Sequence, residues 1–130
     1  MTNKVFVTAF FTQALDLLGK LSKQFPNEPN LPIYRQSLRF MSESQSASVK
    51  FMQNFYKYTL PYKQQILDKN ENFFMKMDYG EQVGGTEQTF MEGIRIKTLY
   101  AEMEKPSQDA IFDYFKVLLL LCEKAKVVKD

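Results

Sequence analysis

The sequence predicts an all-α fold, a compact bundle of about five to six short-to-medium helices in which residues 1–130 form one domain. Apolar residues recur at three- and four-residue spacing through most of the chain, and no segment sustains the alternation typical of a strand. A length of 130 residues also suits one hydrophobic core, and an apolar content of 45% is ordinary for a folded domain.

The first two helices are expected over residues 4–24 and 32–42. Their connection contains three prolines, and Pro32 suits the first turn of the second helix because it has no amide hydrogen to lose there. The second helix should bury Tyr34, Leu38 and Met41. The apolar face of the first helix comprises Val7, Phe10, Phe11, Ala14, Leu18 and Leu21.

A third helix is expected to end near Thr59, after a polar break at residues 42–46 whose serines can cap it. Pro61 disfavours the helical conformation for Leu60, yet it suits the first turn of a short helix over residues 62–67. The chain should therefore bend here. The periodic residues of the third helix are Val49, Met52, Phe55 and Tyr56.

In the second half, residues 68–79 predict one or two helical turns that fix a surface segment to the core, and Gly84-Gly85 predicts a flexible loop. Thr86 should cap a fifth helix that runs to about Met103. The last helix should start at Pro106-Ser107, with the serine as cap, and it carries the most continuous apolar face of the chain.

The side chains that ordinary catalysis needs are scarce. Histidine is absent, and no serine stands in a Gly-x-Ser-x-Gly or Ser-x-x-Lys pattern. The single cysteine, Cys122, lies on a leucine-rich helical face, which favours a buried, inert thiol. We therefore predict a non-enzymatic protein with no catalytic residues and no cofactor.

The pattern nearest to a metal motif is Asp68-Lys69-Asn70-Glu71-Asn72, which places oxygen side chains at the first, third and fifth positions of a calcium loop. The sixth position requires glycine and has Phe73, and the twelfth requires glutamate and has Tyr79. No metal site is predicted.

The protein is expected to reside in a reducing compartment, because a single cysteine cannot form an intrachain disulfide. The apolar N-terminal stretch is interrupted by Gln13, Asp16 and Lys20, which argues against a signal peptide and against secretion. The longest apolar run, residues 117–122, covers six residues, whereas a bilayer span needs about twenty. No transmembrane segment is expected.

One local feature is a candidate for binding a partner. The rings of Phe51, Tyr58 and Tyr62 do not lie on the face formed by the periodic apolar residues of the third helix. Either a second element covers them or they form an exposed patch. Together with Lys57 and Lys63 they make the candidate partner-binding patch, which we name the ring patch. Its expected partners are other proteins or a second copy of the chain. A formal charge of +2 disfavours nucleic acid.

In the order and spacing of several segments, the chain resembles an uncharacterised family of small helical proteins from nucleocytoplasmic large DNA viruses. A tryptophan often stands near the start of the last helix in that family, where this chain has Phe112. The segments that carry the resemblance are Phe25-Pro26-Asn27, Thr59-Leu60-Pro61-Tyr62-Lys63 with Ile66, Glu71-Asn72-Phe73-Phe74 with Asp78-Tyr79, and Asp113-Tyr114-Phe115 with Leu118-Leu119 and Glu123-Lys124.

The resemblance implies a protein of a large DNA virus, and the scarcity of catalytic groups favours a structural component of the virion, such as a minor capsid or internal virion protein. Capsid proteins would then be partners, and the protein would be found in the virion or the host cytoplasm. Two alternatives are a host-interaction or regulatory protein and a nucleic-acid accessory protein. The last would use Lys57, Lys63, Lys69 and residues 124–129, with stacking on Tyr58 and Tyr62.

Overall fold

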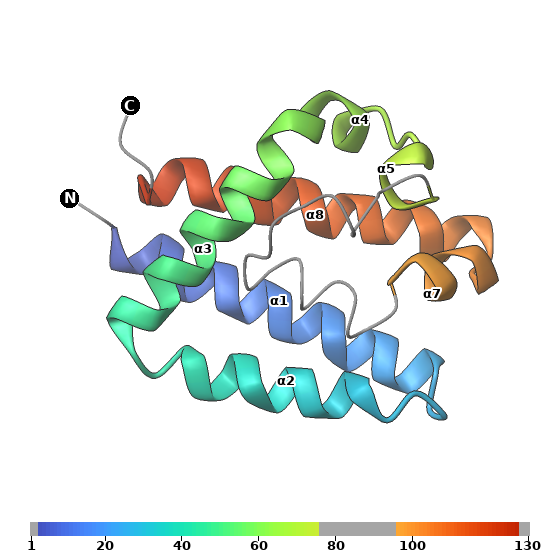
Figure 1. Cartoon of the computed structure of the whole chain (residues 1–130), viewed down its shortest axis with the longest axis horizontal. Helices are drawn as coiled ribbons and strands as arrows, with labels where there is room; N and C mark the ends of the chain where they lie inside the picture. The colour runs from blue at the N-terminus through green and yellow to red at the C-terminus, as the bar shows by residue number, and fades with distance from the viewer. Residues whose placement is uncertain (1–2, 76–95, 128–130) are drawn as a thin grey trace.

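The computed structural model describes residues 3–75 and 96–127, and every regular element in these two ranges is a helix, which confirms the all-α prediction (Figure 1). The elements are α1 (Lys4–Gln24), α2 (Asn30–Met41), α3 (Gln45–Thr59), the 3-10 turn η1 (Leu60–Tyr62), α4 (Lys63–Leu67), α5 (Asn72–Met75), α7 (Ile96–Glu102) and α8 (Lys105–Ala125).

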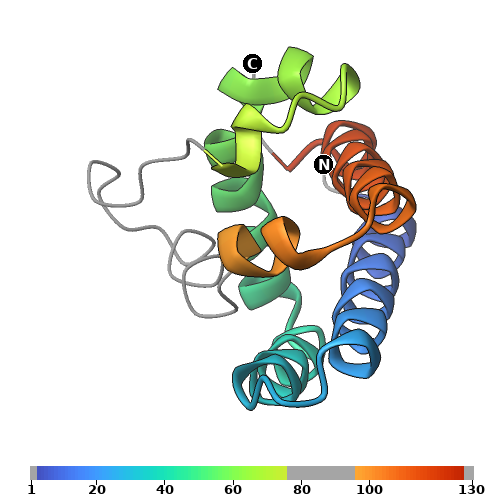
Figure 2. The ribbon, with the colours of Figure 1, turned by 90° about the vertical axis from the view of Figure 1, so that its right-hand side faces the viewer.

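The two longest helices, α1 and α8, pack side by side in opposite directions (Figures 1 and 2). The Asn3 side chain caps α1 by accepting a hydrogen bond from the Val5 amide at 3.0 Å. The backbone amide of Asn3 donates to the Ala125 carbonyl at 3.1 Å, so the start of α1 is joined to the end of α8.

Helix α2 returns along α1 after the proline-containing connection (Figure 1). It begins at Asn30, two residues before the predicted start, and it includes Leu31, which is fully buried. Pro32 lies in the first turn, as predicted, because that position needs no amide donor. Of the residues expected to be buried, Leu38 is buried, whereas Tyr34 and Met41 are half-buried.

Helix α3 crosses α1 and α8 and then bends at η1 (Figure 1). Ser44 caps it by accepting a hydrogen bond from the Ala47 amide at 3.3 Å, as the polar break predicted. The predicted bend at Leu60-Pro61 is confirmed, and α4 then packs on α8. The expectation that Pro61 moves Leu60 out of the helical region is wrong, because Leu60 has φ −55° and ψ −43°.

Helix α8 begins at Lys105, with Pro106 in its first turn. The prediction that Ser107 caps this helix is therefore wrong: proline is tolerated in a first turn, so the helix starts before it. Helix α7 lies within the predicted fifth helix, whereas the expected start at Thr86 and the expected loop at Gly84-Gly85 lie outside the described residues. The Gln108 side chain donates to the Tyr100 carbonyl at 2.8 Å and joins α7 to α8.

A network of aromatic rings fills the centre of the bundle. Phe10 of α1 contacts Phe55 of α3 with ring centroids 5.4 Å apart, and Phe55 contacts Phe115 of α8 at 5.9 Å. Phe74 of α5 extends the network, with its centroid 5.2 Å from that of Phe115. These contacts link helices distant in sequence, so the described helices share one hydrophobic core.

By length and composition alone, α1 could cross a membrane, a criterion that the core helix of a soluble protein also meets. In the bundle α1 packs against α8, α2 and α3. The absence of a transmembrane segment stays a prediction. The buried residues of α1 are Val7, Phe10, Phe11, Ala14, Leu17, Leu18 and Leu21.

Candidate binding groove between α1 and α2

The structure separates the five residues of the ring patch. Phe51 and Tyr58 are buried, with 4% and 7% of their surface exposed, so the alternative of an exposed patch is wrong for these two rings. Tyr62 is half-buried, and its ring lies 5.6 Å from that of Phe73. Lys63 is half-buried and forms an ion pair with Glu123 at 3.0 Å, and Lys57 is the one exposed residue of the five.

The covering elements come from both ends of the chain. The Phe51 ring packs against Phe11 of α1, with centroids 5.9 Å apart. The end of α3 and the following turns lie against α8, where Glu123 accepts hydrogen bonds from Tyr56 and Lys63. Helix α3 is thus covered on two sides, as the alternative prediction of a second covering element required.

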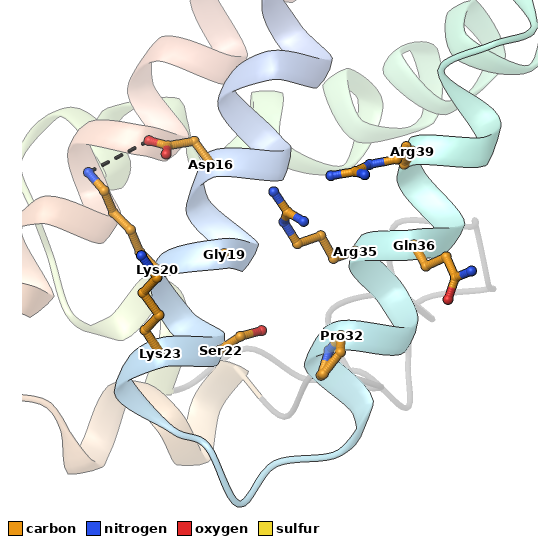
Figure 3. A pocket seen from close by; sticks show the side chains of 9 residues that line it. All are labelled: Asp16, Gly19, Lys20, Ser22, Lys23, Pro32, Arg35, Gln36 and Arg39. Carbon is orange, nitrogen blue, oxygen red and sulfur yellow. Dashed lines mark ion pairs between the residues drawn. The ribbon is translucent and has the colours of Figure 1, made fainter.

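A different surface, which we name the basic groove, lies between the antiparallel helices α1 and α2 and encloses about 700 Å³ (Figure 3). The groove has an excess of positive charge, with four cationic side chains and one carboxylate on its walls. From α1 it is lined by Asp16, Gly19, Lys20, Ser22 and Lys23, and from α2 by Pro32, Arg35, Gln36 and Arg39.

Arg35 is held in place at the centre of the basic groove. Its Nε donates a hydrogen bond to the Leu15 carbonyl at 3.1 Å, which fixes the plane of the guanidinium. Gly19 provides the room, because a Cβ atom at this position would stand 3.3 Å from Arg35 Nε. The guanidinium therefore lies over the backbone of α1, with one terminal nitrogen 3.8 Å from the position that a Cβ of residue 19 would take (Figure 3).

The one carboxylate of the groove is already engaged. Tyr114 of α8 donates a hydrogen bond to Asp16, and Lys20 pairs with the same carboxylate at 3.6 Å. The Tyr114 hydrogen bond is the main cause that lowers the pKa of Asp16, and burial, a smaller cause, opposes it. Figure 3 shows Asp16 and Lys20 turned toward each other, away from Arg35.

Positive charge therefore remains on both walls of the groove, at Lys23 of α1 and at Arg39 of α2. Lys23 and Arg39 are exposed and form no ion pair with any residue in the described ranges 3–75 and 96–127. Arg39 follows Arg35 by one helical turn, and both side chains extend toward α1 (Figure 3). An anionic group in the groove would meet these cations with little competition from protein carboxylates.

Sequence reasoning missed the basic groove because no single segment contains it. Lys20 and Lys23 stand on α1, and Arg35 and Arg39 stand on α2. The spacing of four between the arginines is a signal that they share a helical face. That signal could not show that this face lies beside Gly19 on another helix.

The remaining reactive groups of the described part of the chain offer little chemistry. Cys122 is buried, as predicted, and its Sγ donates to the Met52 carbonyl at 3.6 Å. Burial raises the pKa of this thiol, which disfavours the reactive thiolate. Within residues 3–75 and 96–127, no three His, Cys, Asp or Glu side chains stand together in a way that could hold a metal ion.

Comparison of the chain with protein-family models, with curated proteins and with solved structures gives no match. Function is therefore argued from the geometry and charge of the basic groove.

Ser22 allows a direct test of the packing beneath the groove. Its Oγ is buried and has no hydrogen-bond partner among the described residues. A buried hydroxyl without a partner destabilises a fold, so Ser22→Ala should raise the free energy of unfolding by about 1 kcal/mol, as measured by urea denaturation. Ser37→Ala on the exposed face of α2 is the matched control for helix propensity, and a loss of stability specific to Ser22→Ala would contradict the prediction.

The Asp16 contacts predict a second measurable effect. Tyr114→Phe removes the hydrogen bond that lowers the pKa of Asp16, so that pKa should rise toward the ordinary value of 3.8. In the wild type, the stabilisation is present at neutral pH and is lost as the pH falls below 3.8 through the lowered pKa. Carboxyl-carbon NMR titration measures the change, and Lys20→Gln should move the pKa less. An unchanged Asp16 pKa in Tyr114→Phe would refute the assignment.

Proposed function

We propose that this chain is a non-enzymatic protein-protein interaction protein that holds an acidic segment of its partner in the basic groove. The observation that carries the proposal is the cluster of Lys20, Lys23, Arg35 and Arg39 around a groove whose single carboxylate is bound by Tyr114 and Lys20. Complementary charge across an interface favours association and fixes the register of the partner.

The outward face of α2, on which no residue lines the groove, also exposes apolar side chains. Phe40 is 77% exposed and Ile33 is 58% exposed, although both are large apolar side chains. They stand seven residues apart, two helical turns, and so lie on one face of α2. A partner with acidic residues over the groove and an apolar residue over Phe40 would match both features.

We further propose that the partner belongs to a virus particle, with the chain as a minor capsid or internal virion protein. This part rests on the resemblance to proteins of large DNA viruses and on the scarcity of catalytic groups. Mass spectrometry of purified particles should find the chain enriched with the capsid proteins. Its absence from particles, together with its presence in infected cells, would favour the alternative of a host-interaction or regulatory protein.

A charge exchange tests the basic groove itself. The probe is a labelled fifteen-residue peptide with alternating Glu and Ala, and fluorescence anisotropy at low and moderate salt measures its affinity. We expect binding by the wild type and loss of about tenfold or more in affinity for Arg39→Glu, since this substitution places a carboxylate in the groove. The matched Lys and Ala peptide should bind Arg39→Glu better than it binds the wild type.

Lys57→Glu is the control, because it makes the same change in charge on α3, outside the groove. It should retain most of the affinity for the acidic peptide. Equal losses for Lys57→Glu and Arg39→Glu would mean that net charge alone drives binding, and the groove would then have no special role.

A further inference from the structure

We propose that the anion recognised in the basic groove is a phosphoryl group, so that the groove takes a phosphorylated serine or threonine of the partner. This inference rests on the proposed function and adds the chemical class of the group that is recognised. It follows from the placement of Arg35 and Arg39, from the positive charge of the groove and from its size.

The two arginines form a pair suited to one tetrahedral anion. On a helix, side chains four residues apart start about 6 Å from each other, and both guanidinium groups extend to the same side of α2 (Figure 3). The hydrogen bond to the Leu15 carbonyl restrains the Arg35 guanidinium through Nε and does not use its terminal nitrogens. Guanidinium groups bind phosphate oxygens through two parallel hydrogen bonds, and prior orientation lowers the entropic cost of binding.

The charge of the groove also favours phosphate over carboxylate. The Asp16 carboxylate faces Lys20 and Tyr114, which leaves Arg35 and Arg39 together on the α2 wall of the groove. A carboxylate brings one negative charge and two oxygens. A phosphoserine brings about two negative charges and three strong acceptor oxygens, so it can contact both arginines at once.

The size of the groove also suits such a group. Gly19 has no side chain, which lets the Arg35 guanidinium pack against α1. A volume of about 700 Å³ holds a phosphorylated residue and its flanking backbone. Because the cations cluster in one groove and the formal charge of the chain is +2, one phosphoryl group fits this surface better than a nucleic-acid backbone, which needs a row of positive charges.

The test compares three peptide pools of fifteen residues that differ only at the centre, with phosphoserine, glutamate or serine, and that share degenerate flanks containing acidic residues. Fluorescence anisotropy at moderate salt gives the affinities. We expect the phosphoserine pool to bind wild type about tenfold more tightly than the glutamate pool. Arg39→Lys should remove most of this preference, since lysine keeps the charge and loses the planar fork. Arg35→Lys should do the same, and Lys57→Gln should leave it unchanged.

Four other outcomes overturn the inference or its basis. Equal affinity for the phosphoserine and glutamate pools would refute phosphoryl recognition and leave the acidic-segment proposal standing. No binding of either acidic pool would refute both. Retention of the preference in Arg39→Lys and Arg35→Lys would place phosphate recognition elsewhere. Displacement of the phosphopeptide by duplex DNA or by phosphatidylserine vesicles at lower concentration than by unlabelled phosphopeptide would assign the groove to a nucleic acid or a lipid surface.

Discussion

Phe74→Ala is expected to lower the free energy of unfolding by about 4 kcal/mol, because a buried phenylalanine replaced by alanine loses its transfer free energy and leaves a cavity. Phe74 is fully buried where three helices meet. A domain of this size is stable by about 5–15 kcal/mol, so this loss is a large share of the total. The ring centroids nearest to that of Phe74 are those of Phe73 at 4.7 Å, Tyr100 at 4.9 Å, Phe112 at 5.0 Å and Phe115 at 5.2 Å.

Urea denaturation followed by circular dichroism measures this loss, and Phe40→Ala is the matched control. Phe40 is 77% exposed, so the same chemical change there should alter stability by less than about 0.5 kcal/mol. A similar small effect for Phe74→Ala would mean that α5 is not packed in the core. Because Phe74 contacts Tyr100 and Phe112, such a result would also contradict the packing of α5 against α7 and α8.

Local features of the sequence predicted the helices well, because helix formation depends on interactions between residues that are close in sequence. Periodicity located α1 almost to the residue, and Pro61 located the bend after α3. The start of α8 was misplaced because proline is compatible with both a boundary and a first turn. The sequence signal therefore fixed the type of each element better than its ends.

The candidate site depended on tertiary packing and could not be predicted in the same way. The rings of α3 deviate from one apolar line because α1 and α8 cover two sides of that helix, and periodicity assumes a single buried face. The basic groove was missed for a different reason. Arg35 reads in sequence as an ordinary surface residue of α2, and only the approach of α2 to Gly19 places its guanidinium over α1.

Phe51→Ser distinguishes rings of α3 that are buried in the core from rings that are exposed to a partner. It should lower the free energy of unfolding by about 4 kcal/mol. The change removes a ring that is 4% exposed, and it places a polar hydroxyl among apolar side chains. The ring centroid of Phe51 lies 6.2 Å from that of Phe10 and 5.9 Å from that of Phe11, so the cavity would open against α1. Urea denaturation measures the loss of stability, and the patch hypothesis instead requires a folded variant with weaker self-association.

Analytical ultracentrifugation of Phe51→Ser and Tyr58→Ser, alongside Lys57→Ser, completes the test. Tyr58 is 7% exposed and should behave like Phe51, whereas exposed Lys57 should change neither stability nor association. If both ring variants stay as stable as wild type and only their sedimentation changes, then α3 presents its rings to a partner and the packing of α1 on α3 is wrong. If they unfold as expected, contact with a partner must use another surface, and the basic groove with its four cationic side chains is the candidate.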